Sequence, residues 1–300
     1  MSGGNGPVAP KPRRGEGGFI SDAAIGRLRA LDDLPDLAGT RYDVVEPIGR
    51  GGMGVVFRGR DRELDRDVAI KVTAWSTAAD AERLRAEART LAALEHPGIV
   101  PVHDVGRLPD GRVYSVMTLV RGERLDACAS RLPLPDRLRL FDRICDTVSF
   151  AHSRNVVHGD LKPANIMVGA FGQVLVLDWG GGGTEGYMAP EQRDGPAGTR
   201  SDVYALGAIL RDLIGVPHRV RAHKPLASIV LRAMGSDPGE RYASPGELAA
   251  DVRRFLDGAA VSAHAENPLE RLGRFARTYR TAIALVVTYL VVRVLLLLWR

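Results

Sequence analysis

The stretch His158–Asn165 reads His-Gly-Asp-Leu-Lys-Pro-Ala-Asn, and it lies between a predicted helix and a predicted apolar strand. Asp160, Lys162 and Asn165 place a proton acceptor, a cation and a metal-binding amide oxygen on one short loop. Asp178 follows a second apolar strand and is a second candidate metal ligand. Transfer of a phosphoryl group from a nucleotide requires this combination of groups.

A glycine-rich segment, Gly49-Arg-Gly-Gly-Met-Gly, lies upstream of that loop. The alternation of residues predicts three strands around it, Tyr42–Ile48, Val55–Gly59 and Asp67–Val72, with the glycines in the first turn. Glycines let backbone N–H groups approach phosphate oxygens closely. In a dinucleotide-binding fold such a motif opens a helix, whereas here the chain continues as a strand. On this motif alone, an ordinary glycine hairpin is the alternative.

Lys71 ends an apolar strand, and the next predicted helix, Ala78–Leu94, carries Glu87 in its apolar stripe. A carboxylate on a buried helix face requires a cation, because an unpaired buried charge is costly. Lys71 is the candidate partner. The alternatives are a solvated strand lysine and a glutamate that reaches solvent from the edge of the stripe.

These segments occur in an order that resembles the eukaryotic-type serine/threonine protein kinases of bacteria: the glycine-rich turn, Val68-Ala-Ile-Lys, the 158–165 loop and Asp178-Trp-Gly. The resemblance implies a bilobal α+β fold, with a small antiparallel sheet lobe plus one helix and a larger, mainly helical lobe. The expected boundaries are a disordered arm over 1–18, a helical extension over 19–41, a kinase domain over 42–257 with lobes 42–119 and 120–257, a basic juxtamembrane linker over 258–280 and a transmembrane helix over 281–299.

Other elements of the two lobes are also expected. The resemblance implies a fourth strand at Pro101–Val105 and a fifth at Val113–Leu119. Apolar residues at helical spacing predict a buried helix over Leu134–Ser153, and Ser244 is the expected start of a helix that runs to Leu256.

The resemblance further implies the roles of the site residues. Asp160 would orient and deprotonate a Ser or Thr hydroxyl, Lys162 would neutralise the γ-phosphate, and Asn165 and Asp178 would hold Mg²⁺. Thr184 would contact Asp160 and Lys162. ATP would be bound by Ile48, Gly49, Gly51, Gly54, Val56, Ala69, Lys71, Met117 and Leu119, with Lys71 on the α- and β-phosphates and paired with Glu87.

Further residues receive structural roles from the same resemblance. Glu191 would pair with Arg241, and Asp202 would bind the backbone of the catalytic loop. His152 and His158 would be structural histidines rather than metal ligands. Trp179 stands at the family's usual Phe and would keep an apolar ring for packing.

The chain departs from the family pattern in two places that bear on activity. Gly159 stands where many relatives have an Arg that binds a phosphate on the activation segment, and only Gly181-Gly-Gly separates Asp178-Trp-Gly from Thr184. A second shortening follows Ile214. The main expectation is a serine/threonine kinase acting on proteins, itself among the candidates. The alternatives are a nucleotide-binding pseudokinase or scaffold and a kinase of small molecules.

The charge excess of +5 comes from the C-terminal end. Six arginines and no acid follow Glu270, so residues 1–270 carry 35 basic and 36 acidic side chains. This pattern argues against a nucleic-acid partner and favours anionic lipid, because the arginines adjoin the apolar run 281–299. The arginines and the apolar run together predict a single-pass membrane protein with a cytoplasmic kinase domain. Placing the charge of Arg293 within the bilayer costs free energy, but the many apolar side chains of the span offset it. An amphipathic or protein-buried helix is the alternative. Two cysteines without metal-ligand spacing predict reduced thiols.

Overall fold

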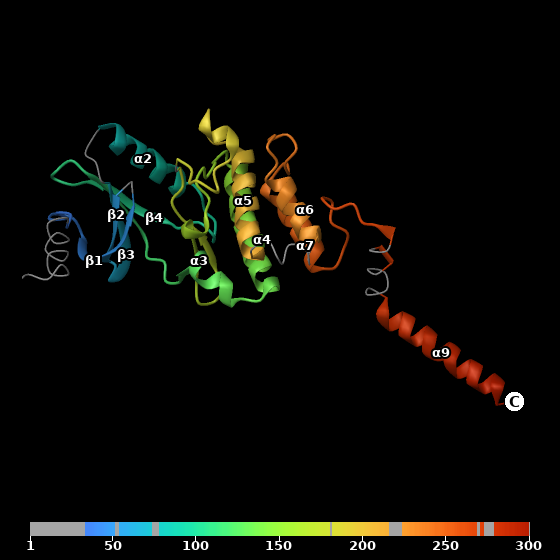
Figure 1. Ribbon diagram of the computed structural model, residues 1–300. Coiled ribbons are helices and arrows are strands. Elements are labelled where there is room, and N and C mark those ends of the chain that lie inside the picture. Colours follow the sequence, from blue (N-terminus) through green and yellow to red (C-terminus); the bar gives the residue numbers. More distant parts are fainter. Residues whose placement is uncertain are drawn as a thin grey trace, which may run out of the picture.

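The computed structural model describes the chain except residues 1–33, 52–53, 74–77, 181, 216–223, 269–270, 273–278 and 300, and it describes only the backbone of 51, 78–81, 83, 84, 87 and 280. Figure 1 shows a sheet lobe, a helical lobe and a separate C-terminal helix in sequence. The predicted arm over 1–18, most of the predicted helical extension over 19–41 and part of the predicted basic linker over 258–280 lie outside the described residues.

The small lobe, or N-lobe, is built on a five-stranded antiparallel sheet in the order β1-β2-β3-β5-β4. Its strands are β1 (Tyr42–Gly51), β2 (Gly54–Asp61), β3 (Arg66–Thr73), β4 (Val102–Arg107) and β5 (Val113–Thr118). The five predicted strands are confirmed. The placement of Gly49 and Gly51 in a turn was wrong, because both belong to β1 and pair with Val56 and Gly54.

The two faces of this sheet differ because side chains alternate along each strand. Phe57, Ile70 and Val116 pair across three strands, are at most 1% exposed, and form the core of the lobe. The opposite face carries the residues one position along each strand, including Lys71. Strand register therefore puts Lys71 on the face away from the lobe's own core.

One helix, α2 (Ala78–Ala92), packs on the N-lobe sheet, and the segment after it attaches the two lobes to each other. The carbonyl of Gly98 accepts a hydrogen bond from Val176 N at 2.8 Å, and Ile99 forms a parallel bridge with Val176. A Cβ at Gly98 would lie 2.0 Å from Thr147 Oγ1, so only glycine allows this approach. The described chain between β5 and β6, around Leu119, is the covalent link between the lobes.

The large lobe, or C-lobe, is mainly helical, with α4 (Leu134–Ser153), α5 (Thr199–Ile214), α6 (Lys224–Ala233) and α7 (Pro245–Leu256) around one apolar core. Helix α4 matches its predicted bounds, and Ser244 caps α7 by accepting from Glu247 N. The short elements are β6 (Glu123–Arg124), α3 (Leu125–Cys128), a 3-10 turn Ala129–Arg131, a 3-10 turn Pro163–Asn165, β7 (Ile166–Val168), β8 (Val174–Val176) and a 3-10 turn Pro190–Arg193. Cys128 and Cys145 are free and buried in this lobe.

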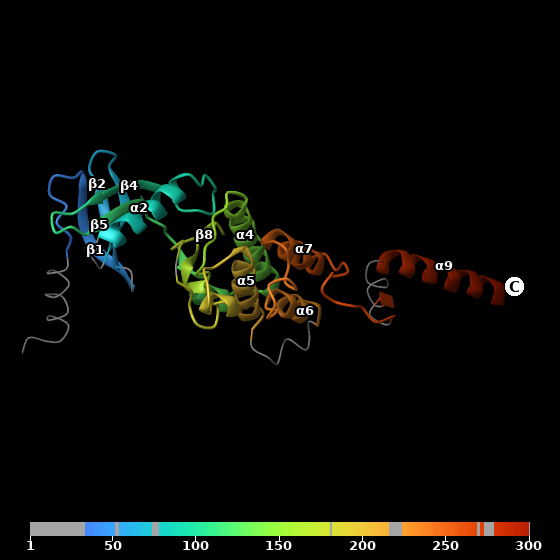
Figure 2. The same cartoon turned by 90° about the horizontal axis from the view of Figure 1, so that it is seen from above.

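Helix α9 (Arg280–Leu298) lies apart from both lobes in Figures 1 and 2. Its segment Thr281–Leu298 has a mean hydropathy of 2.5 and is not buried against the rest of the structure. By length and composition it is the one helix among the described residues that is apolar enough to cross a membrane. Leu and Val side chains are exposed all around it, as a helix in contact with lipid requires.

Candidate active site

The loop His158–Asn165 is anchored through its backbone by one buried carboxylate. Asp202, on α5, accepts hydrogen bonds from His158 N at 2.8 Å and Gly159 N at 2.9 Å. Asp202 also lies 2.8 Å from His152 Nε2, at the end of α4. Two helices of the C-lobe core therefore fix the start of the loop. The predicted roles of Asp202 and His152 are confirmed.

His158 is fully buried and joins this loop to the segment that carries Asp178. Its Nε2 lies 2.9 Å from Leu177 O, and its ring packs 4.7 Å from that of Trp179. Burial lowers the pKa of the imidazole, which favours a neutral ring that donates to the carbonyl. Trp179 is 3% exposed, so the predicted packing of its ring is confirmed. His158 acts as a packing residue and hydrogen-bonding residue, as predicted.

Asp160, Lys162 and Thr184 form a closed triangle of polar side chains. Thr184 Oγ1 donates to Asp160 Oδ1 at 2.6 Å, while Lys162 Nζ donates to Asp160 Oδ2 and to Thr184 Oγ1, both at 2.7 Å. The predicted contacts of Thr184 are confirmed. The side chains of Asp160 and Lys162 are 14% and 24% exposed, so the triangle is shielded yet still reachable from solvent.

Asp178 lies on the N-lobe side of the same site, where its carboxylate meets Lys71. Lys71 Nζ lies 3.1 Å from Asp178 Oδ1. Asp178 has a φ of +54°, a left-handed backbone that Asp tolerates better than most residues. Its side chain is 55% exposed, whereas that of Lys71 is 10% exposed. This ion pair links the two lobes across the site. The side chain of Glu87 is outside the described residues, so its pairing with Lys71 stays a prediction.

Asn165 is oriented with its amide nitrogen toward the catalytic loop. Asn165 Nδ2 donates to Asp160 O at 3.0 Å, which leaves the amide oxygen as an acceptor. The Asn165 carbonyl accepts from Leu177 N at 2.8 Å, so the backbones next to Asn165 and Asp178 are tied together. An amide oxygen and a carboxylate are ligands that Mg²⁺ prefers. These oxygen ligands fit a divalent cation, and Asn165 and Asp178 are the residues that would hold it.

Three of the predicted nucleotide-contact residues, Val56, Ala69 and Met117, lie on the same face of the sheet as Lys71. Val56 pairs with Lys71 across β2 and β3, and Ala69 pairs with Met117 across β3 and β5. Ile48, in β1, is 48% exposed, and a Cβ at Gly54 would lie 1.9 Å from Val72 O. Leu119, just after β5, is half-buried. The register therefore gathers Val56, Ala69 and Met117 beside the lysine, while the tip of the glycine-rich turn lies outside the described residues.

An ion pair between a buried arginine and a partly buried glutamate supports the segment that carries Thr184. Arg241 is 2% exposed, and its two terminal nitrogens donate to the two carboxylate oxygens of Glu191 at 2.7 and 2.8 Å. Ser201 Oγ donates to the same carboxylate at 2.9 Å. The hydrogen bonds from Arg241 lower the pKa of Glu191 to about 2. The predicted pair Glu191–Arg241 is confirmed.

Sequence reasoning missed one residue of this site, Gln192. Its Nε2 donates to Gly159 O at 2.9 Å, and its Oε1 accepts from Ala189 N at 2.9 Å. The sequence Ala189-Pro-Glu-Gln has the spacing at which a Gln side chain returns to the N-cap backbone of a helical turn, which could have indicated half of this arrangement. The bond to Gly159 has no sequence signal, because it joins segments 33 residues apart.

Comparison with known proteins identifies the family to which this arrangement belongs. The protein kinase domain family matches residues 42–235. The chain belongs to that family. This kinase domain is 32% identical to the serine/threonine-protein kinase PknD of Chlamydia caviae, in a match that covers 73% of the chain and 31% of the relative. It is 33% identical to the serine/threonine-protein kinase PknB of Mycolicibacterium smegmatis, covering 76% of the chain and 45% of that relative.

A solved structure gives the same result for the fold. The crystal structure of a single-site mutant of the kinase domain of Mycobacterium tuberculosis PknI has a TM-score of 0.61 to this protein and is 27% identical, over 71% of this chain and 95% of that one. The expected bilobal kinase fold and the bacterial serine/threonine kinase family are therefore confirmed. The chain spans about a third of the length of the Chlamydia relatives that it matches.

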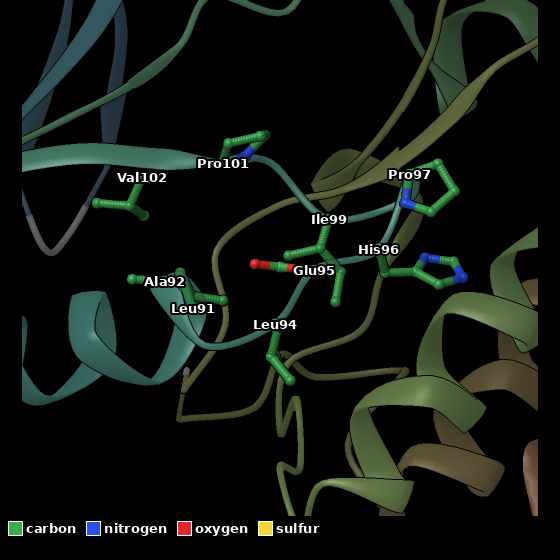
Figure 3. A pocket seen from close by; sticks show the side chains of 9 residues that line it. All are labelled: Leu91, Ala92, Leu94, Glu95, His96, Pro97, Ile99, Pro101 and Val102. Carbon is green, nitrogen blue, oxygen red and sulfur yellow. The ribbon is translucent and has the colours of Figure 1, made fainter.

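A pocket of about 420 Å³ lies outside the catalytic loop of this kinase domain, where α2 ends and β4 begins. Figure 3 shows mostly apolar side chains around it, with the Glu95 carboxylate lying among them. His96, at its rim, stacks on Phe150 of α4 at 4.9 Å. Asp160, Asp178 and Lys71 do not line this pocket, so it is separate from the catalytic groups.

Proposed function

We propose that this protein is a serine/threonine protein kinase that transfers the γ-phosphate of ATP to Ser or Thr hydroxyls of proteins, with Mg²⁺ as its cofactor. The single observation that carries the proposal is the hydrogen bond from Thr184 Oγ1 to Asp160 Oδ1 at 2.6 Å, with Lys162 bridging both residues. Asp160 already accepts a bond from an alcohol at the position where its role requires one.

The arrangement supports transfer through positioning and charge. Asp160 would orient a substrate hydroxyl and take its proton, while Lys162, within 2.7 Å of Asp160, would balance negative charge on the transferring phosphoryl group. Lys71 would bind the phosphates from the N-lobe side, exchanging its contact with Asp178 for the nucleotide. The bound Mg²⁺ would neutralise phosphate charge, held by Asn165 and Asp178. These side chains would accelerate phosphoryl transfer mainly by holding the reactants in line.

The presence of the full set of groups favours an active kinase over a pseudokinase. Asp160, Lys162, Asn165 and Asp178 are all retained, and the contacts among them and with Thr184 are formed although the activation segment is short. The catalytic aspartate, the lysine and the metal-binding side chains are the groups on which phosphoryl transfer depends.

The experiment is autophosphorylation and phosphorylation of a general protein substrate by the full chain in detergent micelles, with labelled ATP and mapping of the modified residues. The wild-type protein should label Ser and Thr, and Asp160→Ala and Lys71→Ala should each abolish labelling. Asp136→Ala, at a partly exposed position on α4 that pairs with the neighbouring Arg139, is the matched control. Undiminished labelling by Asp160→Ala and Lys71→Ala would refute the assigned roles. ATP-dependent thermal stabilisation without transfer would support a pseudokinase, and transfer to metabolites alone would support a small-molecule kinase.

We further propose that α9 anchors the kinase in the cell membrane with its catalytic domain in the cytoplasm, which suits a role in signal transduction. The support is the length and hydropathy of Thr281–Leu298 together with the arginines that precede it. The full chain should remain in the membrane pellet after alkaline extraction, and a protease added outside intact cells should leave the kinase domain uncut. Vesicles with anionic lipid should bind residues 258–280 more tightly than neutral vesicles do. Release by alkali would mean that α9 lies on the membrane or packs against protein.

A further inference from the structure

Gly159 is held through both of its backbone polar atoms, and the two partners come from different parts of the C-lobe. Its N–H donates to Asp202 Oδ1 at 2.9 Å, and its C=O accepts from Gln192 Nε2 at 2.9 Å. Asp160 follows directly. The direction in which the Asp160 side chain leaves the backbone is therefore set by a residue that is clamped at both its polar atoms.

The residue that is clamped has little else to hold it. Gly159 has a φ of +78°, a left-handed backbone that favours glycine, and it has no side chain with which to fix the loop. A glycine peptide in a loop has more conformational freedom than any other, so an external hydrogen bond on its carbonyl restricts it more than elsewhere. Gln192 supplies that bond from outside the loop.

Gln192 also joins the two polypeptide segments that meet in the catalytic triangle. Its Oε1 accepts from Ala189 N, five residues after Thr184. Thr184 in turn donates to Asp160, and its carbonyl accepts from Tyr187 N and Met188 N in a tight turn. One amide side chain thus spans from the backbone just before Asp160 to the backbone of the segment that carries Thr184.

We infer that Gln192 is a positioning residue for the phosphoryl-transfer step, because it fixes the Gly159 peptide and so holds Asp160 in register with Thr184. It does not contact the reacting atoms itself. The inference rests on the proposed function for its kinetic consequence. Its structural consequence, a clamped catalytic loop, is independent of that function.

The test compares Gln192→Met and Gln192→Glu with wild type in the full chain. Met keeps the length of the side chain and loses both hydrogen bonds, whereas Glu keeps an acceptor for Ala189 N and places an oxygen against Gly159 O. Arg193→Met, in the same 3-10 turn and exposed, is the matched control. The measurements are kcat and KM for ATP over a range of pH, thermal unfolding, and hydrogen exchange of the peptides that contain residues 158–165 and 199–214.

We expect Gln192→Met to lower kcat about 10- to 100-fold with little change in KM, because a small misplacement of a catalytic group is costly. Exchange should rise in 158–165 and stay constant in 199–214. Gln192→Glu should be impaired at pH 8 and recover relative to wild type as the pH falls toward 5, because the carbonyl oxygen of Gly159 favours the protonated form of the new carboxyl group, which can donate to it as the amide does. Arg193→Met should match wild type.

Three results separate the possible failures. Unchanged exchange in 158–165 in Gln192→Met would overturn the inference whether or not the protein transfers phosphate. A lower unfolding temperature with unchanged kcat would make Gln192 merely structural and would also overturn it. A wild-type protein that transfers no phosphate, while Gln192→Met loosens the 158–165 loop, would refute the proposed function and leave the clamp standing.

Discussion

The two lobes hold their halves of the candidate site in different ways. In the C-lobe, Asp160 is fixed by side chains that bind backbone atoms and one another, with Asp202, Gln192 and Thr184 each within 3.0 Å of an atom of the catalytic loop. In the N-lobe, Lys71 and Met117 are fixed by the register of the sheet, in which backbone hydrogen bonds alone decide which residues are neighbours. The C-lobe half is a network of hydrogen-bonded polar side chains, and the N-lobe half is one face of a sheet whose residues are positioned by strand pairing.

This difference predicts different responses to substitution. Removing one member of the polar network leaves its partners buried and unsatisfied, which concentrates the damage on the chemistry. A substitution in the sheet changes the shape of the surface, or it disturbs the register and so moves several residues together. Each of the following experiments breaks one half and leaves the other as a reference.

The largest effect is expected for Asp160→Asn in the C-lobe network. The amide keeps the size of the side chain and can still accept a hydrogen bond from Thr184, but it cannot take a proton. We expect kcat to fall about 10²- to 10⁴-fold, while the thermal shift caused by Mg-ATP persists because the N-lobe surface is intact. Asp136→Asn on α4 is the control. Loss of the ATP-dependent shift would show that the two halves are not independent.

The next effect concerns the Glu191–Arg241 ion pair, which supports the segment that carries Thr184. Arg241→Met should lower the free energy of unfolding by about 2–4 kcal/mol, because it removes the partner of the partly exposed Glu191 carboxylate and leaves the carbonyls of Gly235 and Arg200 without their donor. Urea denaturation measures the change. Arg139→Met removes an exposed pair with Asp136 and should cost less than about 1 kcal/mol. Equal losses in the two variants would contradict the buried character of the first pair.

In the N-lobe, Gly54→Ala should cost about 1–3 kcal/mol in the free energy of unfolding. The new Cβ would lie 1.9 Å from Val72 O at a φ of +145°, so β2 must shift against β3 near Lys71. We expect KM for ATP to rise more than kcat falls. Gly195→Ala, where the nearest atom to a Cβ is 4.0 Å away, is the control and should be near neutral. A kcat effect with unchanged KM would mean that the sheet acts on the chemistry directly.

The smallest effect is the acid dependence of the Glu191–Arg241 pair. Because the folded-state pKa of Glu191 is lowered from 4.5 to about 2, the pair contributes its full stability above pH 4.5 and loses it as the pH falls toward 2. The carboxylate is 30% exposed, which reduces the contribution to about 1–2 kcal/mol. Unfolding at pH 5 and pH 3 should therefore differ more in wild type than in Arg241→Met. Parallel pH profiles of wild type and Arg241→Met would show that this pair does not cause the loss of stability in acid.

Residue alternation by itself predicts part of the N-lobe half of the site, whereas the confirmed contacts of the C-lobe half, such as that of Thr184 with Asp160, were predicted from the family resemblance. Val68-Ala-Ile-Lys shows by its alternation that Lys71 faces away from Ile70, and strand pairing then places the neighbours. Gly49 and Gly51 were misplaced because glycine signals a turn more strongly than it signals a strand, while the ladder to β2 extends through them. Gln192 was missed, since its bond to Gly159 depends on the tertiary contact of two loops that no local pattern encodes. The contact of Lys71 with Asp178 likewise has no local signal, because it joins residues 107 positions apart.

The contact between Gly98, Thr147 and Val176 has a mechanical consequence. Together with the covalent link near Leu119, it joins the lobes at two separate points, and two points define an axis. Rotation about that axis keeps both joints intact, whereas sliding one lobe across the other would break the bond between Val176 N and Gly98 O. We therefore expect the low-cost motion of the protein to be a hinge rotation of one lobe against the other, which changes the distance between Lys71 and Asp178 and leaves the 158–165 loop unmoved within the C-lobe.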